Sequence, residues 1–100
     1  MKIKLNFISV VLLFSLFSLN IFADDHNDAQ KLVKSGEILS LEIILKELRK
    51  TSQGRVIEVE LERKNSQLVY EIEVLNVQGE VLEYVFAAKT GKLISKDIEN

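Results

Sequence analysis

The hydrophobic period of this chain changes at Gly54, and this change limits the folds open to it more than any other feature. Before Gly54, apolar residues recur every three or four positions, as on one face of a helix. After it, apolar residues alternate with polar ones, most of them glutamates. This alternation predicts strands with one buried and one solvated face. We expect three strands, over residues 57–62, 70–75 and 82–88, and residues 93–95 can add a short fourth.

Two helices are predicted ahead of the strands. Ser40 is a suitable N-cap, and the stripe after it predicts a helix over 40–52, with apolar residues at Leu41, Ile44, Leu45 and Leu48. A shorter helix is expected to end at Gly36. Because both helices precede the strands, no strand–helix–strand crossover is available. The predicted class is α+β: an antiparallel β-meander of three to four strands, with one main helix packed on one face and a short N-terminal helix before it.

The alternation also limits how the first two strands pair, because directly opposed residues share a face of the sheet. Leu61 can face Leu68, which gives a Lys64-Asn65 turn, or it can face Tyr70, which gives a four-residue loop. Either register gathers five glutamates on the face away from the helix: Glu58, Glu60, Glu62, Glu71 and Glu73. For the next hairpin, the pattern favours a loop of odd length around residues 78–80.

The first 23 residues have the pattern of a secretory signal peptide. Lys2 and Lys4 precede an apolar run over 7–19, and Ala23 precedes the first acidic residues. A membrane-spanning helix needs ~20 apolar residues, so an uncleaved anchor is the less favoured alternative. We expect cleavage after Ala23 and a periplasmic or secreted product without stable membrane insertion. The mature chain would be a single domain of residues 24–100, whose formal charge changes from −2 to −4 with the loss of two lysines.

Composition excludes several classes of function. The chain has no Cys and one His, which excludes a disulfide framework, a thiol nucleophile and a thiolate metal site. We interpret His26 as a solvated residue near the start of the mature chain rather than as a metal ligand. The chain has no glycine-rich phosphate loop, and its acidic charge disfavours nucleic acid. We therefore expect a protein that is not an enzyme and that uses no cofactor.

The five-glutamate face is the main candidate site. One interpretation is a surface that binds a partner protein, formed by Glu58, Glu60, Glu62, Glu71, Glu73 and Val85. A second is a weak site for a divalent cation, with Glu58, Glu60, Glu71 and Glu73 as candidate ligands. A solvated outer face without a specific role is the simplest interpretation. Acid–base catalysis, as in glycoside hydrolysis, would need a concave site and a raised pKa, which we do not expect on a flat, exposed sheet.

Apolar residues also fall on or near the glutamate side: Val69, Leu75, Val77, Val81 and Val85. Because the helix covers the other face, we expect these residues to form surface that is open to a partner protein or to a second copy of the chain. The first or the fourth strand would form an edge of the sheet, where a partner could add a strand.

Four segments, taken in order, resemble the PepSY domain family. They are the helix start at 38–45, the first strand at 54–62, the second strand at 70–75 and the closing turn at 88–93. The resemblance covers residues 37–96, and it implies an exported domain that acts as an inhibitory or regulatory module toward peptidases. The chain departs from the family at Ile43, where an acidic residue often completes a capping box, and at Ala87, where Asp is usual.

The function predicted from these observations is that of an exported, non-catalytic binding module that regulates or inhibits a partner protein such as a peptidase. The alternative is a small-ligand or divalent-cation sensing accessory protein that uses the acidic sheet face. The sequence leaves open whether the chain forms a homodimer, and it does not identify the partner protein.

Overall fold

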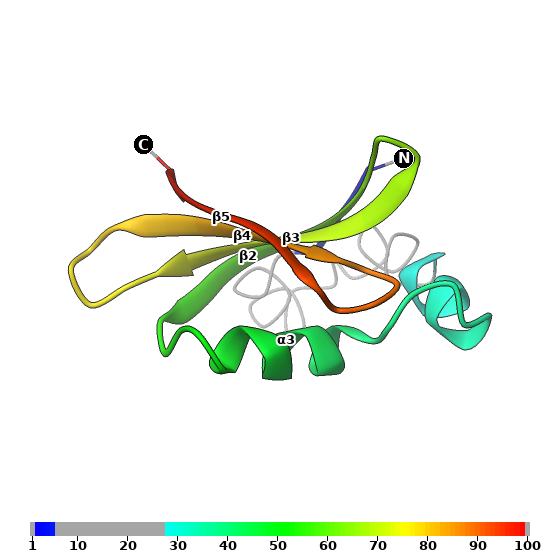
Figure 1. Ribbon diagram of the computed structural model, residues 1–100, viewed down its shortest axis with the longest axis horizontal. Helices are drawn as coiled ribbons and strands as arrows, with labels where there is room; N and C mark the ends of the chain where they lie inside the picture. Colours follow the sequence, from blue (N-terminus) through cyan, green and yellow to red (C-terminus); the bar gives the residue numbers. More distant parts are fainter. Residues whose placement is uncertain (1, 6–27, 100) are drawn as a thin grey trace, which may run out of the picture.

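The computed structural model of the chain describes residues 2–5 and 28–99. The described strands form one antiparallel sheet in the order β1-β2-β3-β4-β5, and α3 runs along one face of it (Figure 1). The elements are β1 Lys2–Leu5, α3 Leu41–Arg49, β2 Arg55–Lys64, β3 Gln67–Leu75, β4 Val81–Ala87 and β5 Leu93–Glu99. The α+β class and the antiparallel meander of β2 to β5 are confirmed. None of the described helices is long and apolar enough to span a membrane.

Strand β1 was not predicted. It lies within the segment expected to be a signal peptide, and its backbone pairs with the edge of β2 that β3 leaves open. The rest of that segment, including the apolar run over 7–19 and the expected cleavage site after Ala23, lies outside the described residues, as does His26. The signal peptide therefore stays a prediction.

Helix α3 begins where Ser40 provides its cap. Ser40 has extended backbone angles (φ −67°, ψ 155°), and its hydroxyl accepts a hydrogen bond from the Ile43 amide at 3.4 Å. The helix ends at Arg49 with Lys50 as C-cap, which is earlier than the predicted end at residue 52. Ile44 and Leu48 are fully buried, and burying side chains of this size contributes ~1.5–3 kcal/mol each. The predicted apolar stripe thus supplies the buried face of the helix.

Residues 28–34 are helical, and the beginning of this helix lies outside the described residues. It ends with the pair of hydrogen bonds that is typical of a left-handed glycine cap: Gly36 N donates to Val33 O at 3.1 Å, and Glu37 N donates to Leu32 O at 3.1 Å. Gly36 has a φ of +80°, which a residue with a side chain rarely adopts. The predicted stop at this glycine is therefore present.

The described core joins α3 to the sheet. Ile44 and Leu48 belong to one buried cluster with strand residues that include Val59, Ile72 and Phe86. Tyr70 adds a hydrogen bond between the sheet and the segment before α3. Its hydroxyl donates to the carbonyl of Leu39, which precedes the helix cap, at 2.9 Å. Burial, followed by the charge of Glu42, raises the pKa of Tyr70 to about 12. All described residues of this cluster lie between positions 29 and 88, so a chain of residues 24–100 retains them.

The β2–β3 hairpin uses the second predicted register, with Leu61 opposite Tyr70. The predicted four-residue loop is wrong, however, because the ladder continues to the pair of Lys64 and Gln67. The turn is therefore only Asn65-Ser66, and both residues have positive φ, +50° and +66°. Two positive φ values are typical of the tight turn whose twist matches that of paired strands. At the other end, Ile57 is an extra residue in β2, a bulge between the pairs Val56–Val74 and Glu58–Glu73.

The last two strands extend the meander. The β3–β4 loop spans residues 76–80, between the paired Leu75 and Val81, so the predicted odd length is confirmed. Asn76 shapes this loop, because its side-chain oxygen accepts from the amides of Gln78 and Glu80 at 3.0 and 2.9 Å. The fourth strand of the meander, predicted over 93–95, is present as β5, which continues to Glu99.

Candidate functional site

The sheet is hollowed on the side that carries the glutamates. The hollow has a volume of about 260 Å³, and the residues that line it are Glu58, Glu60, Glu62, Lys64, Glu71, Glu73, Glu83 and Glu99. We call these eight residues the glutamate basin. The five glutamates expected on one face all line it. The basin has a single positively charged side chain in its lining, that of Lys64.

Strand pairing places acid directly opposite acid in this basin. Glu58 faces Glu73 and Glu60 faces Glu71 across β2 and β3, and Glu73 also faces Glu83 across β3 and β4. Side chains at directly opposed positions of an antiparallel pair have Cβ atoms about 5 Å apart. Carboxylates at that distance repel each other, so the basin concentrates negative charge at a cost to the fold.

Lys64 partly balances this charge. Its ammonium nitrogen lies 2.8 Å from Oε2 of Glu71, whose side chain is almost fully buried. The hydrogen bond to Glu71 raises the pKa of Lys64, against the opposing effect of burial, and the nearby charges of Glu71, Glu62 and Glu83 act in the same direction as the bond. Lys64 therefore remains a cation, and it shows that the basin can hold an ammonium group.

The centre of the basin binds protons more tightly than isolated carboxylates do. Burial, followed by hydrogen bonding to Glu99 and by the charge of Glu58, raises the pKa of Glu73 to about 7. Burial and the charges of Glu71 and Glu99 also raise the pKa of Glu83, with a smaller opposing effect from Lys64. The expectation of a flat face with no hollow and no raised pKa is therefore wrong on both points. Side-by-side strands bring the carboxylates close enough to disfavour ionisation of all of them together.

Carboxylate oxygens in the basin form two close groups, Glu60 with Glu62 and Glu71, and Glu73 with Glu83 and Glu99. Within each group the oxygens lie within 4.8 Å of one another, which is the spacing at which one Ca²⁺ with ligands at ~2.4 Å could bridge them. Of the four residues predicted as cation ligands, Glu60 and Glu71 belong to the first group and Glu73 to the second, while Glu58 belongs to neither. A cation in the first group would compete with Lys64 for Glu71.

Sequence reasoning missed Glu83 and Glu99. Glu83 alternates with the apolar Leu82 and Tyr84, so its position on the outer face could have been read from the same pattern as the others. Glu99 gave no such signal, because most of β5 is exposed and its sequence does not alternate between apolar and polar residues.

Residues 38–97 match the family described as "Peptidase propeptide and YPEB domain", or PepSY. The chain belongs to the PepSY family. PepSY domains are generally propeptide-like or peptidase-associated modules, are usually non-catalytic, and occur typically in exported proteins. The match includes α3 and all of β2, β3 and β4, which carry every basin residue except Glu99. No curated protein and no solved structure matches the chain.

Of the five apolar residues expected to form open surface beside the glutamates, two are buried and two are half-buried in this PepSY domain. Val85 is paired with Glu71 and Ser95 on the glutamate side, but only 6% of it is exposed, and Val69 is exposed by 2%. The prediction that Val85 offers exposed surface to a partner is therefore wrong. Val77, in the β3–β4 loop, is 94% exposed and is the one residue of that predicted patch that stands clearly open.

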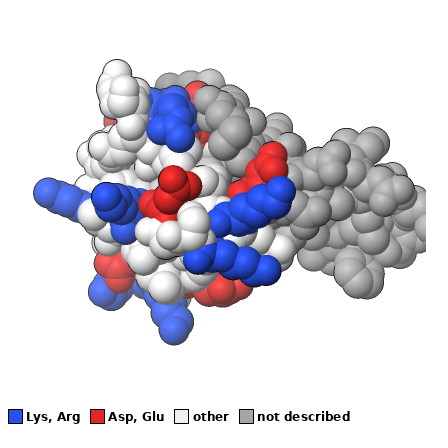
Figure 2. Space-filling view, turned by 90° about the vertical axis from the view of Figure 1, so that its right-hand side faces the viewer, with Lys and Arg blue, Asp and Glu red and all other residues white. Residues whose placement is uncertain are grey.

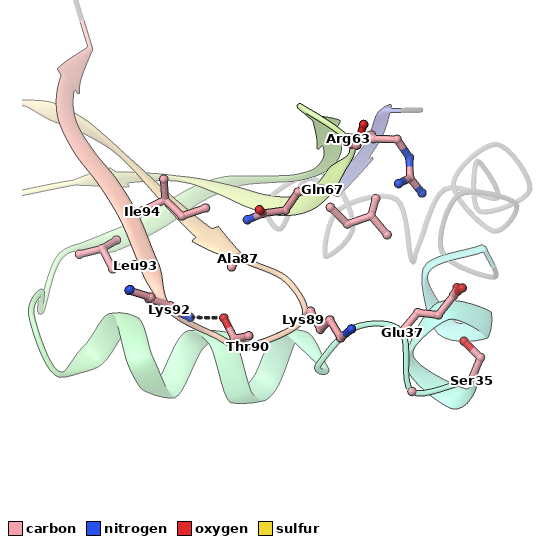
Figure 3. Close-up of a pocket in the computed structure, with 13 residues that line it drawn as sticks. Ser35, Glu37, Arg63, Gln67, Ala87, Lys89, Thr90, Lys92, Leu93 and Ile94 are labelled. Carbon is pink, nitrogen blue, oxygen red and sulfur yellow. Dashed lines mark hydrogen bonds between the residues drawn. The ribbon is translucent and has the colours of Figure 1, made fainter.

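A second hollow of the PepSY domain, of about 940 Å³, was not foreseen from the sequence. It lies between the turn that leads into β5, the start of β3 and residues 35–37, as Figure 3 shows. Arg63, Lys89 and Lys92 line it together with the acidic Glu37, so its lining is net positive. The end of the molecule on the right of Figure 1, viewed directly in Figure 2, likewise shows more basic than acidic side chains.

Ala87, where the resemblance led us to expect Asp, lies at the side of this second hollow. The turn after it is closed without a side chain at that position. Ala87 N donates to Lys92 O at 2.8 Å, and Gly91 N donates to Ala87 O at 2.8 Å. The Thr90 hydroxyl accepts from the Lys92 amide at 3.2 Å, the bond drawn in Figure 3. Backbone groups and Thr90 thus hold the turn in this chain.

Proposed function

We propose that this PepSY domain is an exported, non-catalytic module that binds a partner protein, such as a peptidase, through the glutamate basin and so regulates or inhibits it. The observation that carries the proposal is the gathering of seven glutamates around one lysine in a hollow of the sheet. That hollow lies on β2, β3, β4 and β5, on the glutamate side of the sheet. A positively charged group of the partner is the natural occupant.

Electrostatics supports a basic partner. In the free domain, the repulsion among the carboxylates is reduced by a proton on Glu73, whose pKa is about 7, and by the ion pair of Lys64 with Glu71. A lysine or arginine from a partner would reduce the same repulsion without that proton. Charge complementarity of this kind gives both specificity and fast association.

The domain of residues 24–100 is first used to capture its partner from an envelope extract. The partner is then identified and purified. Its dissociation constant is measured for the native domain and for Glu60→Lys, a change inside the basin. We expect Glu60→Lys to weaken binding about tenfold or more. Glu42→Lys is the matched control, because it makes the same charge change on an exposed position of α3. Equal affinity of all three proteins would overturn the proposal.

Cation sensing is a second candidate, favoured by the two close groups of carboxylate oxygens. It is separated from partner binding by melting curves in millimolar Ca²⁺ and in other divalent ions. Binding to the folded state raises the melting temperature, so an unchanged melting temperature would remove this candidate and leave the first intact.

A further inference from the structure

The backbone of Lys2–Leu5 occupies the edge of β2 in a definite register. Lys2 is paired with Glu62, Ile3 with Leu61, Lys4 with Glu60 and Leu5 with Val59. The two lysine positions are thus aligned with two glutamates of the basin. The edge of β2 therefore accepts an extended segment in which basic and aliphatic residues alternate.

The two faces of β2 give a physical reason for that alternation. Val59 and Leu61 are fully buried in the core, whereas Glu60 and Glu62 line the glutamate basin. A strand added to this edge lays every second residue on each face of the sheet. Alternate positions would therefore meet the carboxylates, and the positions between them would continue the apolar face.

A second copy of the chain does not suit this edge. If β2 paired with β2 of another copy so that matching faces met, an antiparallel register would place Glu60 opposite Glu60 and Glu58 opposite Glu62. Directly opposed like charges destabilise a strand pair. In this register the edge of β2 therefore disfavours a second copy of itself and favours a basic strand.

We propose that, once residues 1–23 have been removed, the edge of β2 is the site at which an extended segment of the partner protein, with Lys or Arg at alternate positions and aliphatic residues between them, is added as an antiparallel strand. The inference rests on the proposed function and specifies the partner's chemistry. Main-chain hydrogen bonds supply affinity in strand addition, and the alternate side chains supply specificity. In the full chain, Lys2–Leu5 holds the place of that segment.

The probe is a capped peptide of sequence Thr-Lys-Ile-Lys-Leu-Thr, titrated into the domain of residues 24–100. A peptide with Glu in place of both Lys is the charge control, and we expect it to bind at least about tenfold more weakly. The Glu60→Gln/Glu62→Gln variant is expected to lose a similar factor for the Lys peptide. Circular dichroism shows whether that variant is folded.

Peptide N-methylation tests the strand geometry without any change to the protein. In an antiparallel pair, successive amides point alternately toward and away from the neighbouring strand, and methylation removes one donor. One series is methylated at the first, third and fifth residues, and the other at the second, fourth and sixth. Strand addition predicts that one series loses binding about tenfold or more while the other keeps it.

The outcomes separate this inference from the proposed function. Equal binding of the two N-methyl series would overturn strand addition but leave a basin that attracts basic groups. No binding of the Lys peptide, with partner affinity still sensitive to Glu60→Lys, would also overturn strand addition alone. A dimer of the domain that the peptide dissociates would assign the edge to a second copy and overturn the inference. Partner affinity insensitive to Glu60→Lys would overturn the proposed function itself.

Discussion

Glu73 on β3 lies directly opposite Glu58 on β2, so two acidic side chains occupy one cross-strand pair. Directly opposed like charges destabilise a sheet by about 0.2–1 kcal/mol per pair. The domain reduces this penalty by holding a proton on Glu73, whose pKa is raised to about 7, first by burial and then by Glu99 and Glu58.

The first prediction concerns pH. Because the pKa of Glu73 is higher in the folded state than its ordinary value of 4.5, the folded state binds more protons than the unfolded state between pH 4.5 and 7. Stability therefore falls as the pH rises through this window. After discounting for solvent screening, we expect a loss of ~1 kcal/mol between pH 5 and pH 8, or ~4 °C or more in melting temperature.

Glu73→Gln is the control for this pH effect, because it removes the titrating group and keeps the shape. The variant should melt at a higher temperature than the native domain at pH 8 and show a weaker dependence on pH. A native melting temperature that is flat or rises from pH 5 to pH 8 would contradict the prediction.

The second prediction concerns Lys64. Lys64→Met removes the cation 2.8 Å from the nearly buried Glu71 and leaves an apolar chain of similar length. Because Glu71 is nearly buried while Lys64 is about half exposed, loss of the cation is destabilising but less so than in a fully buried pair, and we expect ~1–2 kcal/mol in urea denaturation at pH 8. Lys50→Met is the matched control. It breaks the exposed Glu47–Lys50 pair, for which we expect less than ~0.5 kcal/mol. Equal effects of the two substitutions would refute the role given to Lys64.

The third prediction concerns Gly54. A Cβ at this position would collide with Cγ1 of Val74 and lie 2.7 Å from the Leu75 carbonyl oxygen. Gly54→Ala should therefore force β2 and β3 apart at this end, with a loss of ~2 kcal/mol or more. At Gly36 a Cβ would meet nothing within 4 Å, so Gly36→Ala should show only the cost of its positive φ, ~1 kcal/mol. Urea denaturation of both variants gives the comparison, and a smaller loss for Gly54→Ala would contradict it.

The fourth prediction concerns export. If residues 1–23 are a signal peptide, the protein recovered from the cell envelope or the medium begins at Asp24. Intact-mass measurement would show this, and the formal charge would be −4 in place of −2. A recovered chain that retains residues 1–23 would favour the uncleaved anchor. It would also leave Lys2–Leu5 in place on the edge of β2.

The pattern of the sequence was enough to place α3, the strands β2 to β5 and five of the basin glutamates, because the buried and exposed faces of helices and strands follow directly from the hydrophobic period. The sequence pattern could not predict features that depend on where the pairing of two strands ends. The turn at Asn65-Ser66 is shorter than the four-residue loop predicted for this register, because pairing continues to Lys64 and Gln67. Likewise Glu99 was missed, since the exposed end of β5 has no apolar alternation.

The proton affinity of the basin could not be predicted from the sequence either. The raised pKa of Glu73 depends first on burial and then on Glu99 and Glu58, which belong to the other strands β5 and β2. Burial of Val85 is a similar case, since alternation gives the face of a residue but not what covers it. Strand β1 was missed because Lys2 and Lys4 fit the basic start of a signal peptide equally well.

The extra residue at Ile57 determines how β2 responds to changes in its length. On either side of this bulge, Val56 and Val59 both contribute to the apolar face, although their numbers differ in parity. Deletion of Ile57 would join the two halves into a regular ladder and leave every other residue of the strand on its present face. Deletion of any residue from Glu58 to Lys64 would move the side chains on one side of the deletion to the opposite face of the sheet. A one-residue deletion in this strand can therefore be absorbed at Ile57, while the same deletion four residues later would turn the glutamates on one side of it inward.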